Sequence, residues 1–461
     1  MKLHRTTLFI FRRDLRLEDN IGLNHALKNS EKVITAFILD PLQIGPDNTY
    51  KSDNCIEFMF ESIKDLSDQI ASKHGYLNIL HGSIDTVLNK LIEYASIDAL
   101  VCNYDYTPYS ARRDLIIKKI CEQKGIAFYQ FHDLLINSPD SIMNTSGKPY
   151  RVFAAFYKHS LKIPVTLSEN KTISNLSNKK LIDDQGLEIL DRIPFVKNSQ
   201  IHVHGGSRNG HKLLKRLHLL ENYPKTHDIP SIPTSNLSAH NKFGTISIRQ
   251  VHTAISLHVP SPAAILRQLY WRDFYTYVAY YSPYVFGNAF VEKYNALHWN
   301  TNENDFKIWT EGLTGFPIVD AALRQINITG YMHNRCRLIV ASFLTKDLHI
   351  NWQWGEKYFA QKLVDYDPCV NNGNWQWVAS TGCNASPYFR VFNPWLQQKK
   401  FDPECVYIKT WIPELEKVPS KVIHNWDKLH TRYPLLGYPK PMVNHSTQAA
   451  ITKNLFKHIL K

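Results

Sequence analysis

The sequence predicts an amino-terminal α/β domain built on a doubly wound parallel sheet, followed by a carboxy-terminal domain that is nearly all helical. Two observations support this fold class, and a third indicates that the two halves have different functions. At 461 residues with 44% hydrophobic content, the chain is too long for one ordinary core. Short apolar runs alternate with amphipathic stretches up to residue 131, whereas helical spacing dominates after residue 200. All ten tryptophans lie after residue 270, so stacking or redox chemistry is expected in the second half.

The first 131 residues alternate predicted strands and helices. Such an alternation is the βαβ pattern, which favours parallel strands joined by right-handed crossovers. No Gly-x-Gly-x-x-Gly follows the first strand, so an ordinary Rossmann dinucleotide site is not supported. The expected strands are 7–11, 33–39, 77–81, 99–103 and 127–131, and the expected helices are 56–73, 86–94 and 110–124.

The middle of the chain has a different composition. Over 132–200 the periodicity weakens while Asn, Ser, Lys and Pro accumulate, most clearly over 170–180, which predicts a linker. Helical spacing follows over 262–281, 318–329, 335–346 and 354–363. We therefore expect an α/β domain over 1–131, a linker over 132–200 and a helical domain over 201–461.

Charge and cysteine usage limit the class of protein. Lys and Arg number 54 against 41 Asp and Glu, and this net charge of +13 favours a polyanionic partner, although a generally basic proteome would give the same balance. Seven scattered cysteines without a Cys-x-x-Cys pair are typical of a reduced, cytoplasmic protein. The sequence indicates neither a signal peptide nor a membrane span, and we expect a monomer.

Several motifs could carry chemistry on their own. The glycine-rich stretch 205–210 is followed by His211, where a phosphate loop needs Lys and then Ser or Thr. The hydroxyl-rich stretch 234–238 could hold phosphate oxygens or simply cap a helix. Asp365 and Asp367 have no His at ligand spacing, so we expect no metal, and carboxylates two residues apart make a weak acid–base pair. Hydrogen bonding to a bound cofactor is their third interpretation.

Six motifs follow one another along the chain: 11–20 (FRRDLRLEDN), 234–238 (TSNLS), 269–274 (LYWRDF), 314–321 (TGFPIVDA), 332–335 (MHNR) and 371–377 (NNGNWQW). Taken in this order, they resemble the DNA photolyase and cryptochrome family over essentially the whole chain. The resemblance implies an antenna domain followed by a helical domain that holds FAD. It also implies that light-excited reduced FAD passes an electron to a cyclobutane pyrimidine dimer flipped out of UV-damaged DNA.

The resemblance implies a role for each residue that matches a motif. Asn371 would face the flavin N5, where a neutral amide favours repair and a carboxylate would favour a protonated radical. Trp375, Trp352 and Trp299 would conduct electrons to the flavin from the protein surface. The implied FAD contacts are Tyr223, Thr234, Ser235, Asn236, Leu237, Ser238, Arg272, Arg337, Asp365, Tyr366 and Asp367, in addition to Asn371.

The lesion pocket and the DNA-binding face are implied in the same way. Trp271 and Trp377 would form the walls of the dimer pocket and, with Gln268 and Asn371, make up the expected catalytic set. The implied DNA contacts are His227, Gln268, Trp271, Tyr275, Asn334, Leu338, Trp377, Arg390 and Gln397.

Three departures from the family pattern bear on function. Gln268 replaces a usual Glu and Leu338 a usual Met; a neutral hydrogen bond at 268 in place of a charged one would weaken dimer binding or stabilisation of the dimer radical anion by about tenfold. Gln268 resembles the residue found in (6-4) photolyases and animal cryptochromes, but the (6-4) enzymes need two histidines where this chain has Asn334 and Leu338. Ser110 replaces the acidic residue expected for folate, so a second antenna chromophore, folate or deazaflavin, stays undecided.

The leading hypothesis is therefore a light-driven lyase for cyclobutane dimers, with (6-4) repair ranked below it. The main alternative is a cryptochrome-type blue-light receptor with little or no repair activity. A third is a flavin-free module that binds single-stranded nucleic acid. The basic charge favours a DNA-binding face and hence the first hypothesis.

Overall fold

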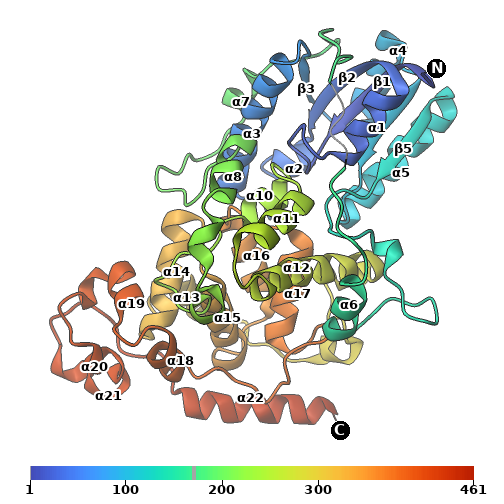
Figure 1. The fold of residues 1–461 in the computed structure, drawn as a ribbon. Helices are drawn as coiled ribbons and strands as arrows, with labels where there is room; N and C mark the ends of the chain where they lie inside the picture. Colours follow the sequence, from blue (N-terminus) through green and yellow to red (C-terminus); the bar gives the residue numbers. More distant parts are fainter. Residues whose placement is uncertain (1, 169–172, 461) are drawn as a thin grey trace. The chain divides into compact units, whose positions relative to one another are not determined.

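A computed structural model gives the fold shown in Figure 1 and describes residues 2–168 and 173–460. Contacts divide the chain into two compact units. The first comprises Met1–Asn198, Val203–Glu221 and Ser235–Pro283, and the second comprises Ser199–His202, Asn222–Thr234 and Tyr284–Lys461. An α/β unit and a helical unit are present, so the predicted fold class is confirmed.

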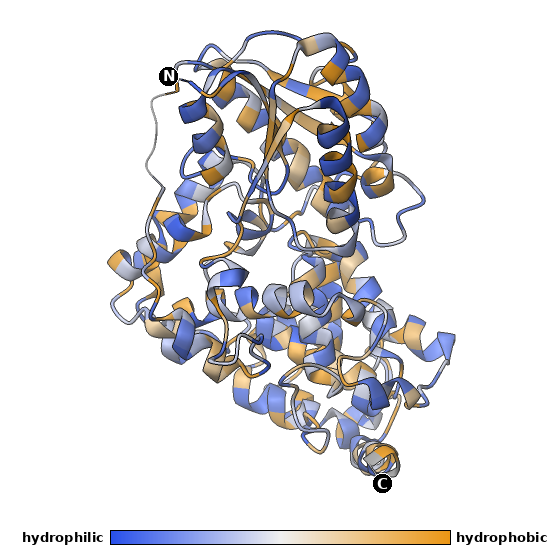
Figure 2. Ribbon diagram, turned by 90° about the vertical axis from the view of Figure 1, so that its right-hand side faces the viewer, coloured by the Kyte–Doolittle hydropathy of each residue, from blue (hydrophilic) through white to orange (hydrophobic). Residues whose placement is uncertain are grey.

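The first unit is built on a parallel sheet with strand order β3-β2-β1-β4-β5. The register pairs Leu8 of β1 with Ile34 of β2 on one side and with Leu100 of β4 on the other. The strands are largely hydrophobic (Figure 2), as expected for a parallel sheet covered on both faces. All five expected strands are confirmed: β1 (His4–Phe11), β2 (Ser30–Leu39), β3 (Leu77–His81), β4 (Ala99–Asn103) and β5 (Ala127–Phe131).

Helices cover both faces of this sheet. Leu8 and Ile10 pack with the apolar stripes of α4 and α5 on one face, and the alternation of a strand turns Phe9 to the other face, toward Gly22 of α1. The helices of this unit are α1 (Ile21–Asn29), α2 (Pro41–Ile44), α3 (Asp53–Ala71), α4 (Ile84–Ala95), α5 (Pro108–Lys124), α6 (Phe153–Ser160), α7 (Ile189–Arg192), α8 (Ser207–Leu214), α10 (Ser238–Phe243), α11 (Ile248–His258) and α12 (Ala263–Tyr281), with 3₁₀ turns η1 (Pro139–Ser141) and η2 (Leu217–Leu220). A further 3₁₀ turn, η3 (Pro283–Val285), begins at the last residue of this unit.

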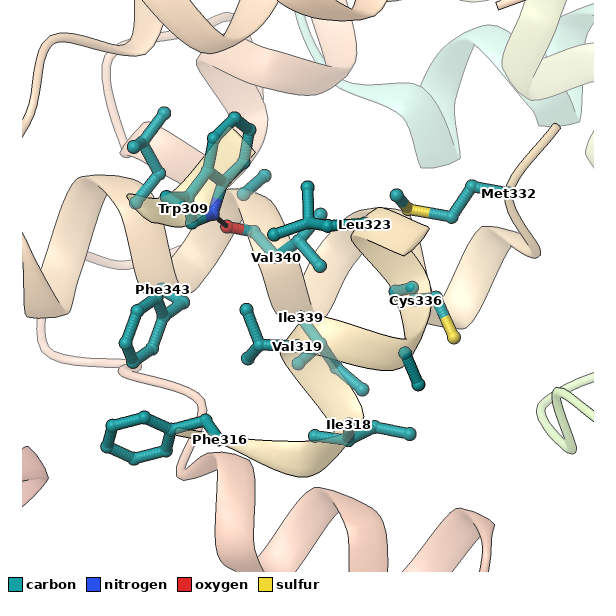
Figure 3. Close-up of a cluster of buried hydrophobic side chains, with 14 of the residues drawn as sticks. Trp309, Phe316, Ile318, Val319, Leu323, Met332, Cys336, Ile339, Val340 and Phe343 are labelled. Atoms are coloured by element: carbon teal, nitrogen blue, oxygen red, sulfur yellow. Dashed lines mark hydrogen bonds between the residues drawn. The ribbon is translucent and has the colours of Figure 1, made fainter. Parts of the chain in front are cut away.

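The second unit is helical and has its core around α14 and α15 (Figure 3). Trp309 lies in that core and donates its indole N–H to the Val340 carbonyl, 3.3 Å away. The elements are α9 (Tyr223–Thr226), η4 (Glu292–Ala296), α13 (Glu303–Glu311), α14 (Pro317–Thr329), α15 (Asn334–Ser342), the π-helix η5 (Phe343–Asp347), α16 (Trp352–Lys362), α17 (Pro368–Ala379), α18 (Pro394–Phe401), α19 (Val406–Trp411), η6 (Pro413–Leu415), α20 (Ser420–Ile423), α21 (Trp426–Leu429), η7 (His430–Arg432) and α22 (His445–Leu460).

Two segments differ from the expected elements. The stretch 132–200 contains the helix α6, whose Phe153 and Phe156 are buried against Trp271 and Phe274 of α12; residues 169–172 of the stretch lie outside the described residues. The helix expected over 335–346 is α-helical only to Ser342 and then continues as η5. In the ranges 2–168 and 173–460, no helix combines the length and the apolar character needed to cross a membrane.

Candidate functional site

A cavity of about 140 Å³ in the second unit gathers eight of the predicted site residues. Two helices form much of its wall, because α15 and α17 each place a stripe of residues spaced i, i+3, i+4 and i+7 toward it. Phe359 of α16 (Trp352–Lys362) and the turn after that helix supply the rest. The predicted residues on the wall are Asn334, Arg337, Leu338, Asp365, Tyr366, Asp367, Asn371 and Trp375; the other lining residues are Ala341, Phe359, Leu363, Val370, Asn374 and Val378.

Arg337 and Asp365 form an ion pair on the cavity wall. The guanidinium donates from Nη2 to Asp365 Oδ2 at 2.8 Å and from Nε to the Met332 carbonyl at 2.8 Å. The second carboxylate oxygen, Asp365 Oδ1, is buried and has no hydrogen-bond partner among the described residues. A buried acceptor without a donor is costly, so this atom is suited to a ligand that brings an N–H or O–H group.

Asp367 is the N-cap of α17. Its Oδ1 accepts the backbone N–H groups of Cys369 and Val370 at 3.0 and 3.3 Å, and Pro368 occupies the first helical position. A proline at this position costs the helix no hydrogen bond, because the first N–H groups of a helix have no intrahelical acceptor. Asp367 therefore fixes the start of the helix that carries Asn371 and Trp375.

The Asn371 side chain is oriented by the neighbouring helix. Its Nδ2 donates to the backbone carbonyl of Glu356 on α16 at 3.0 Å, which leaves Oδ1 to meet a ligand in the cavity. The Glu356 carboxyl group is itself buried and accepts a hydrogen bond from Asn372 Nδ2 at 2.9 Å. Burial raises the pKa of Glu356 to about 7, an effect that the Asn372 hydrogen bond opposes. Sequence reasoning missed Glu356; its only signal was a lone carboxylate in an aromatic helix.

The predicted electron-transfer tryptophans occupy connected segments of this unit. Trp375 packs on α16 at Gly355, where an added Cβ would lie 2.1 Å from the indole Cη2. Trp352 is the first residue of α16, one turn before Gly355. Asn300, next to Trp299, donates its backbone N–H to the His349 carbonyl at 2.7 Å and pairs with Ile350. Trp377, predicted to form a pocket wall, is half-buried against the same core.

The segment 222–234 also belongs to the second unit and is anchored to α15. Asp228 pairs with Arg335, with 2.7 Å between Oδ2 and Nη2, and Thr234 hydrogen-bonds the side chain of Tyr331. This segment carries three predicted residues, Tyr223, His227 and Thr234, all half-buried. Of the predicted DNA contacts on later elements, Arg390 is exposed and Gln397 is half-buried.

The remaining predicted residues lie in the first unit. Arg272 donates to the Leu134 and Asn241 carbonyls and to Asp273, at distances of 2.9 to 3.1 Å, so its guanidinium joins three segments of that unit. Trp271 stacks on Phe153 with ring centroids 3.6 Å apart. Gln268 is exposed, whereas Tyr275 is buried beside Trp271.

The hydroxyl-rich stretch leads into α10 in this unit. Leu237 is the N-cap of α10 and makes no side-chain capping bond, so the stretch does not cap the helix through a side chain at this position. Asn236 adopts a left-handed conformation (φ 54°), and Ser238 starts the helix. Ser235 lies half-buried before them.

The glycine-rich stretch 205–210 does not form a phosphate loop. The backbone N–H groups of Gly205, Gly206 and Ser207 donate to Glu61, Ser62 and Asp65 at 2.6 to 2.9 Å. These donors are already satisfied, two of them by acidic side chains that would repel a phosphate. Within the described part of the chain, no group of three His, Cys, Asp or Glu side chains is placed to hold a metal ion.

The cavity residues fit a flavin. Asp365 Oδ1 offers a buried acceptor to a donor on the ligand, Arg337 provides positive charge beside it, and Asn371 presents an uncharged amide. Phe359 and Trp375 supply aromatic surface on the same wall, with ring centroids 5.0 Å apart. Apolar and aromatic walls with a few well-placed polar groups are typical of cofactor sites.

Comparison with known proteins gives matches over nearly the whole chain. Residues 7–172 match the family described as DNA photolyase, and residues 265–458 match the FAD binding domain of DNA photolyase. A deoxyribodipyrimidine photo-lyase from Alkalihalophilus pseudofirmus is 36% identical, with 97% of each chain covered. An archaeal photolyase from Sulfolobus tokodaii, solved with two FAD molecules, is 40% identical with a TM-score of 0.88, covering 98% of this chain and 100% of its own. A cryptochrome from Synechocystis is 25% identical with the same TM-score, covering 99% and 100%.

Proposed function

Because the chain belongs to the DNA photolyase family, we propose that it is a light-driven lyase that uses FAD to split cyclobutane pyrimidine dimers in UV-damaged DNA. The observation that carries this proposal is the neutral amide of Asn371 on a cavity wall that also holds the buried Asp365 Oδ1. An amide at this place supports repair chemistry over a receptor, because it can hydrogen-bond a reduced, anionic flavin without adding a negative charge.

The residues of the cavity would have different roles in holding the cofactor. FAD, when bound, reduced and illuminated, supplies the electron that opens the cyclobutane ring. Asp365 would accept a donor of the flavin ring or ribose through Oδ1, while Arg337 holds the other oxygen in place. Asp367 fixes α17, and the Glu356 carbonyl orients Asn371 on it. Trp375, Trp352 and Trp299 would return an oxidised flavin to its reduced state by passing electrons inward.

The lesion contacts are proposed from the family motifs. Trp271 and Trp377 would form the walls of the dimer pocket, and Gln268, Asn334 and Leu338 would contact the lesion. The side-chain amide of Gln268 is exposed to solvent, and its Nε2 donates to the Ala264 carbonyl one turn earlier, at 3.2 Å. The remaining proposed DNA contacts are His227, Tyr275, Arg390 and Gln397.

A blue-light receptor is the second candidate function. The likeness to the Synechocystis cryptochrome and the glutamine at position 268 favour it. It predicts that illumination changes the flavin but leaves DNA lesions in place.

Lesion repair separates these possibilities. Reduced protein is mixed with oligonucleotides that carry either one cyclobutane dimer or one (6-4) photoproduct and is kept in the dark or under blue light. We expect intact thymines only from the cyclobutane substrate and only in the light. Restoration of the (6-4) substrate alone would change the lesion assignment, and no restoration of either substrate would favour the receptor.

A further inference from the structure

We propose that Trp309 is a second electron donor to Trp375, so that the tryptophan path branches at Trp375 and its second arm ends at Tyr358. This inference rests on the proposed function, because it requires that Trp375 reduce a photoexcited oxidised flavin. It assigns a function to a residue that would otherwise serve only to pack the core.

Ring contacts make the second arm continuous. The ring centroids of Trp309 and Trp375 are 6.4 Å apart in an edge-to-face arrangement, and those of Trp309 and Tyr358 are 5.4 Å apart. Both separations fall within the range of about 4.5 to 7 Å at which aromatic side chains touch. Trp309 is 0% exposed, so no solvent separates these three oxidisable rings.

The surroundings of Trp309 favour passing an electron hole onward. Its indole N–H donates to the Val340 carbonyl, 3.3 Å away, and a backbone carbonyl is too weak a base to take the proton. An oxidised Trp309 would therefore stay positively charged in an apolar core, where an isolated charge is strongly disfavoured. Taking an electron from a neighbour that can lose a proton removes this cost.

Tyr358 is such a neighbour. Its hydroxyl lies 2.9 Å from the Thr310 carbonyl and also hydrogen-bonds the side-chain oxygen of Asn327, which is exposed. Burial raises the pKa of Tyr358, so the phenol keeps its proton until the ring is oxidised. The exposed Asn327 then gives that proton a short route to water.

The transfer balances in three steps. Trp375, having given one electron to the photoexcited oxidised flavin, takes one electron from Trp309. Trp309 takes one electron from Tyr358, and Tyr358 releases its phenolic proton to water near Asn327. No bond between heavy atoms forms or breaks, and the net result is one electron delivered inward and a neutral tyrosyl radical.

The test blocks one arm at a time in the FAD-loaded protein. Flavin photoreduction is measured in Trp375→Phe, Trp352→Phe, Trp309→Phe and the double variant Trp352→Phe/Trp309→Phe. Light-induced electron paramagnetic resonance is recorded in parallel on protein made with ring-deuterated tyrosine, which narrows a tyrosyl signal. Trp426→Phe in the Trp352→Phe background is the matched control, because Trp426 is equally buried and donates its N–H to the Pro439 carbonyl.

We expect Trp375→Phe to slow photoreduction by about tenfold or more. Trp352→Phe alone should keep a measurable part of the photoreduction rate and show a tyrosyl signal. Adding Trp309→Phe to it should lower the rate to that of Trp375→Phe, whereas adding Trp426→Phe should not. If Trp309→Phe does not fold, Tyr358→Phe in the Trp352→Phe background must abolish the tyrosyl signal. The branch is wrong if Trp352→Phe alone is as slow as Trp375→Phe, or if the tyrosyl signal survives loss of Tyr358. Wild-type photoreduction in Trp375→Phe would instead overturn the electron path of the proposed function.

Discussion

Asp365 and Asp367 lie two residues apart and meet different partners. Asp367 precedes Pro368 at the start of a helix and accepts two backbone N–H groups there, a role that the Asp-Pro pair already indicates in the sequence. Asp365 pairs with Arg337, which is 28 positions away, and has a buried oxygen without a donor. Only the fold brings Asp365 and Arg337 together, so the sequence alone could name Asp365 but could not show that one of its oxygens is buried without a donor.

Replacing Glu356 by Gln should change how stability depends on pH. Burial raises the pKa of Glu356 from 4.5 to about 7, so the folded state holds its proton more tightly than the unfolded state does. Stability therefore falls as pH rises from about 4.5 through 7. Glu356→Gln keeps the acceptor for Asn372 and removes the titration, so it should be more stable than wild type at pH 8 by on the order of 3 kcal/mol.

Thermal melts of wild type and Glu356→Gln at pH 5 and pH 8 measure this effect, with the exposed Glu404→Gln as control. We expect the two proteins to converge at pH 5 and the control to follow wild type at both pH values. Equal stability of Glu356→Gln and wild type at pH 8 would contradict the assigned pKa shift.

At the scale of elements, α16 and α17 approach closely because position 355 has no side chain. A Cβ there would lie 2.1 Å from Trp375 Cη2 and 2.7 Å from Leu344 Cδ2, and real Cβ contacts are almost never so short. Gly355→Ala should therefore destabilise the protein by about 1 to 3 kcal/mol, despite a gain of about 1 kcal/mol in helix propensity. Chemical denaturation checks this. A variant as stable as wild type would mean that Trp375 does not pack against α16 at this position.

The π-helix η5 places two titratable side chains beneath α22. Lys346 is 0% exposed, donates from Nζ to Ser380 Oγ at 2.7 Å and lies 4.4 Å from the centre of the Phe456 ring. Asp347 pairs with His445 at 2.6 Å, and burial raises the pKa of Asp347 to about 6. Helical periodicity predicted a helix as far as residue 346, but η5 packs against α22, a contact that local spacing does not reveal.

Lys346 should produce a rise in stability at alkaline pH. Burial lowers its pKa from 10.5 to about 7, so between these values the folded state carries fewer protons than the unfolded state and stability increases with pH. Lys346→Met should flatten that increase, whereas Met at the exposed Lys399 should leave it unchanged. Melting temperatures between pH 7 and 9.5 measure the slope. An unchanged slope in Lys346→Met would show that this amine does not titrate in that window.

At the scale of the whole molecule, the sequence predicted the elements that have a strong local pattern and missed elements whose local pattern is weak. The five strands were found because buried parallel strands are continuous apolar runs. Helix α1 was missed, although Asn20 caps it by accepting the Leu23 N–H at 3.1 Å, because its nine residues give a weak periodic signal. Helix α6 was not predicted because it lies in a polar stretch. Its aromatic residues are buried by packing on α12, which the local pattern does not show.

The candidate site shows the same contrast between residues that the sequence identifies and residues whose role depends on tertiary contacts. The family resemblance supplied the eight predicted residues of the cavity wall. Glu356, Gly355 and Trp309 were not identified, since each acquires its role from a tertiary contact: the hydrogen bond from Asn372, the indole of Trp375, and the rings of Trp375 and Tyr358. A single sequence does not record such contacts.

The net charge of +13 predicts that DNA binding depends strongly on salt. Each phosphate neutralised by Lys or Arg releases counterions, which contributes about −0.9 to the slope of log K against log salt for duplex DNA. Titrations at several salt concentrations should give a similar, steep slope for damaged and undamaged duplexes, with tighter binding of the damaged one. A flat plot would rule out a phosphate-contacting face.

The most direct test counts dimers split per protein molecule. Reduced protein is illuminated with a large excess of an oligonucleotide that carries one cyclobutane dimer, and restored thymines are quantified over time against a dark sample. The account predicts that restored thymine pairs exceed the protein several-fold in the light and stay at background in the dark. A light-dependent flavin signal with no restored thymines, or equal restoration in light and dark, would contradict it.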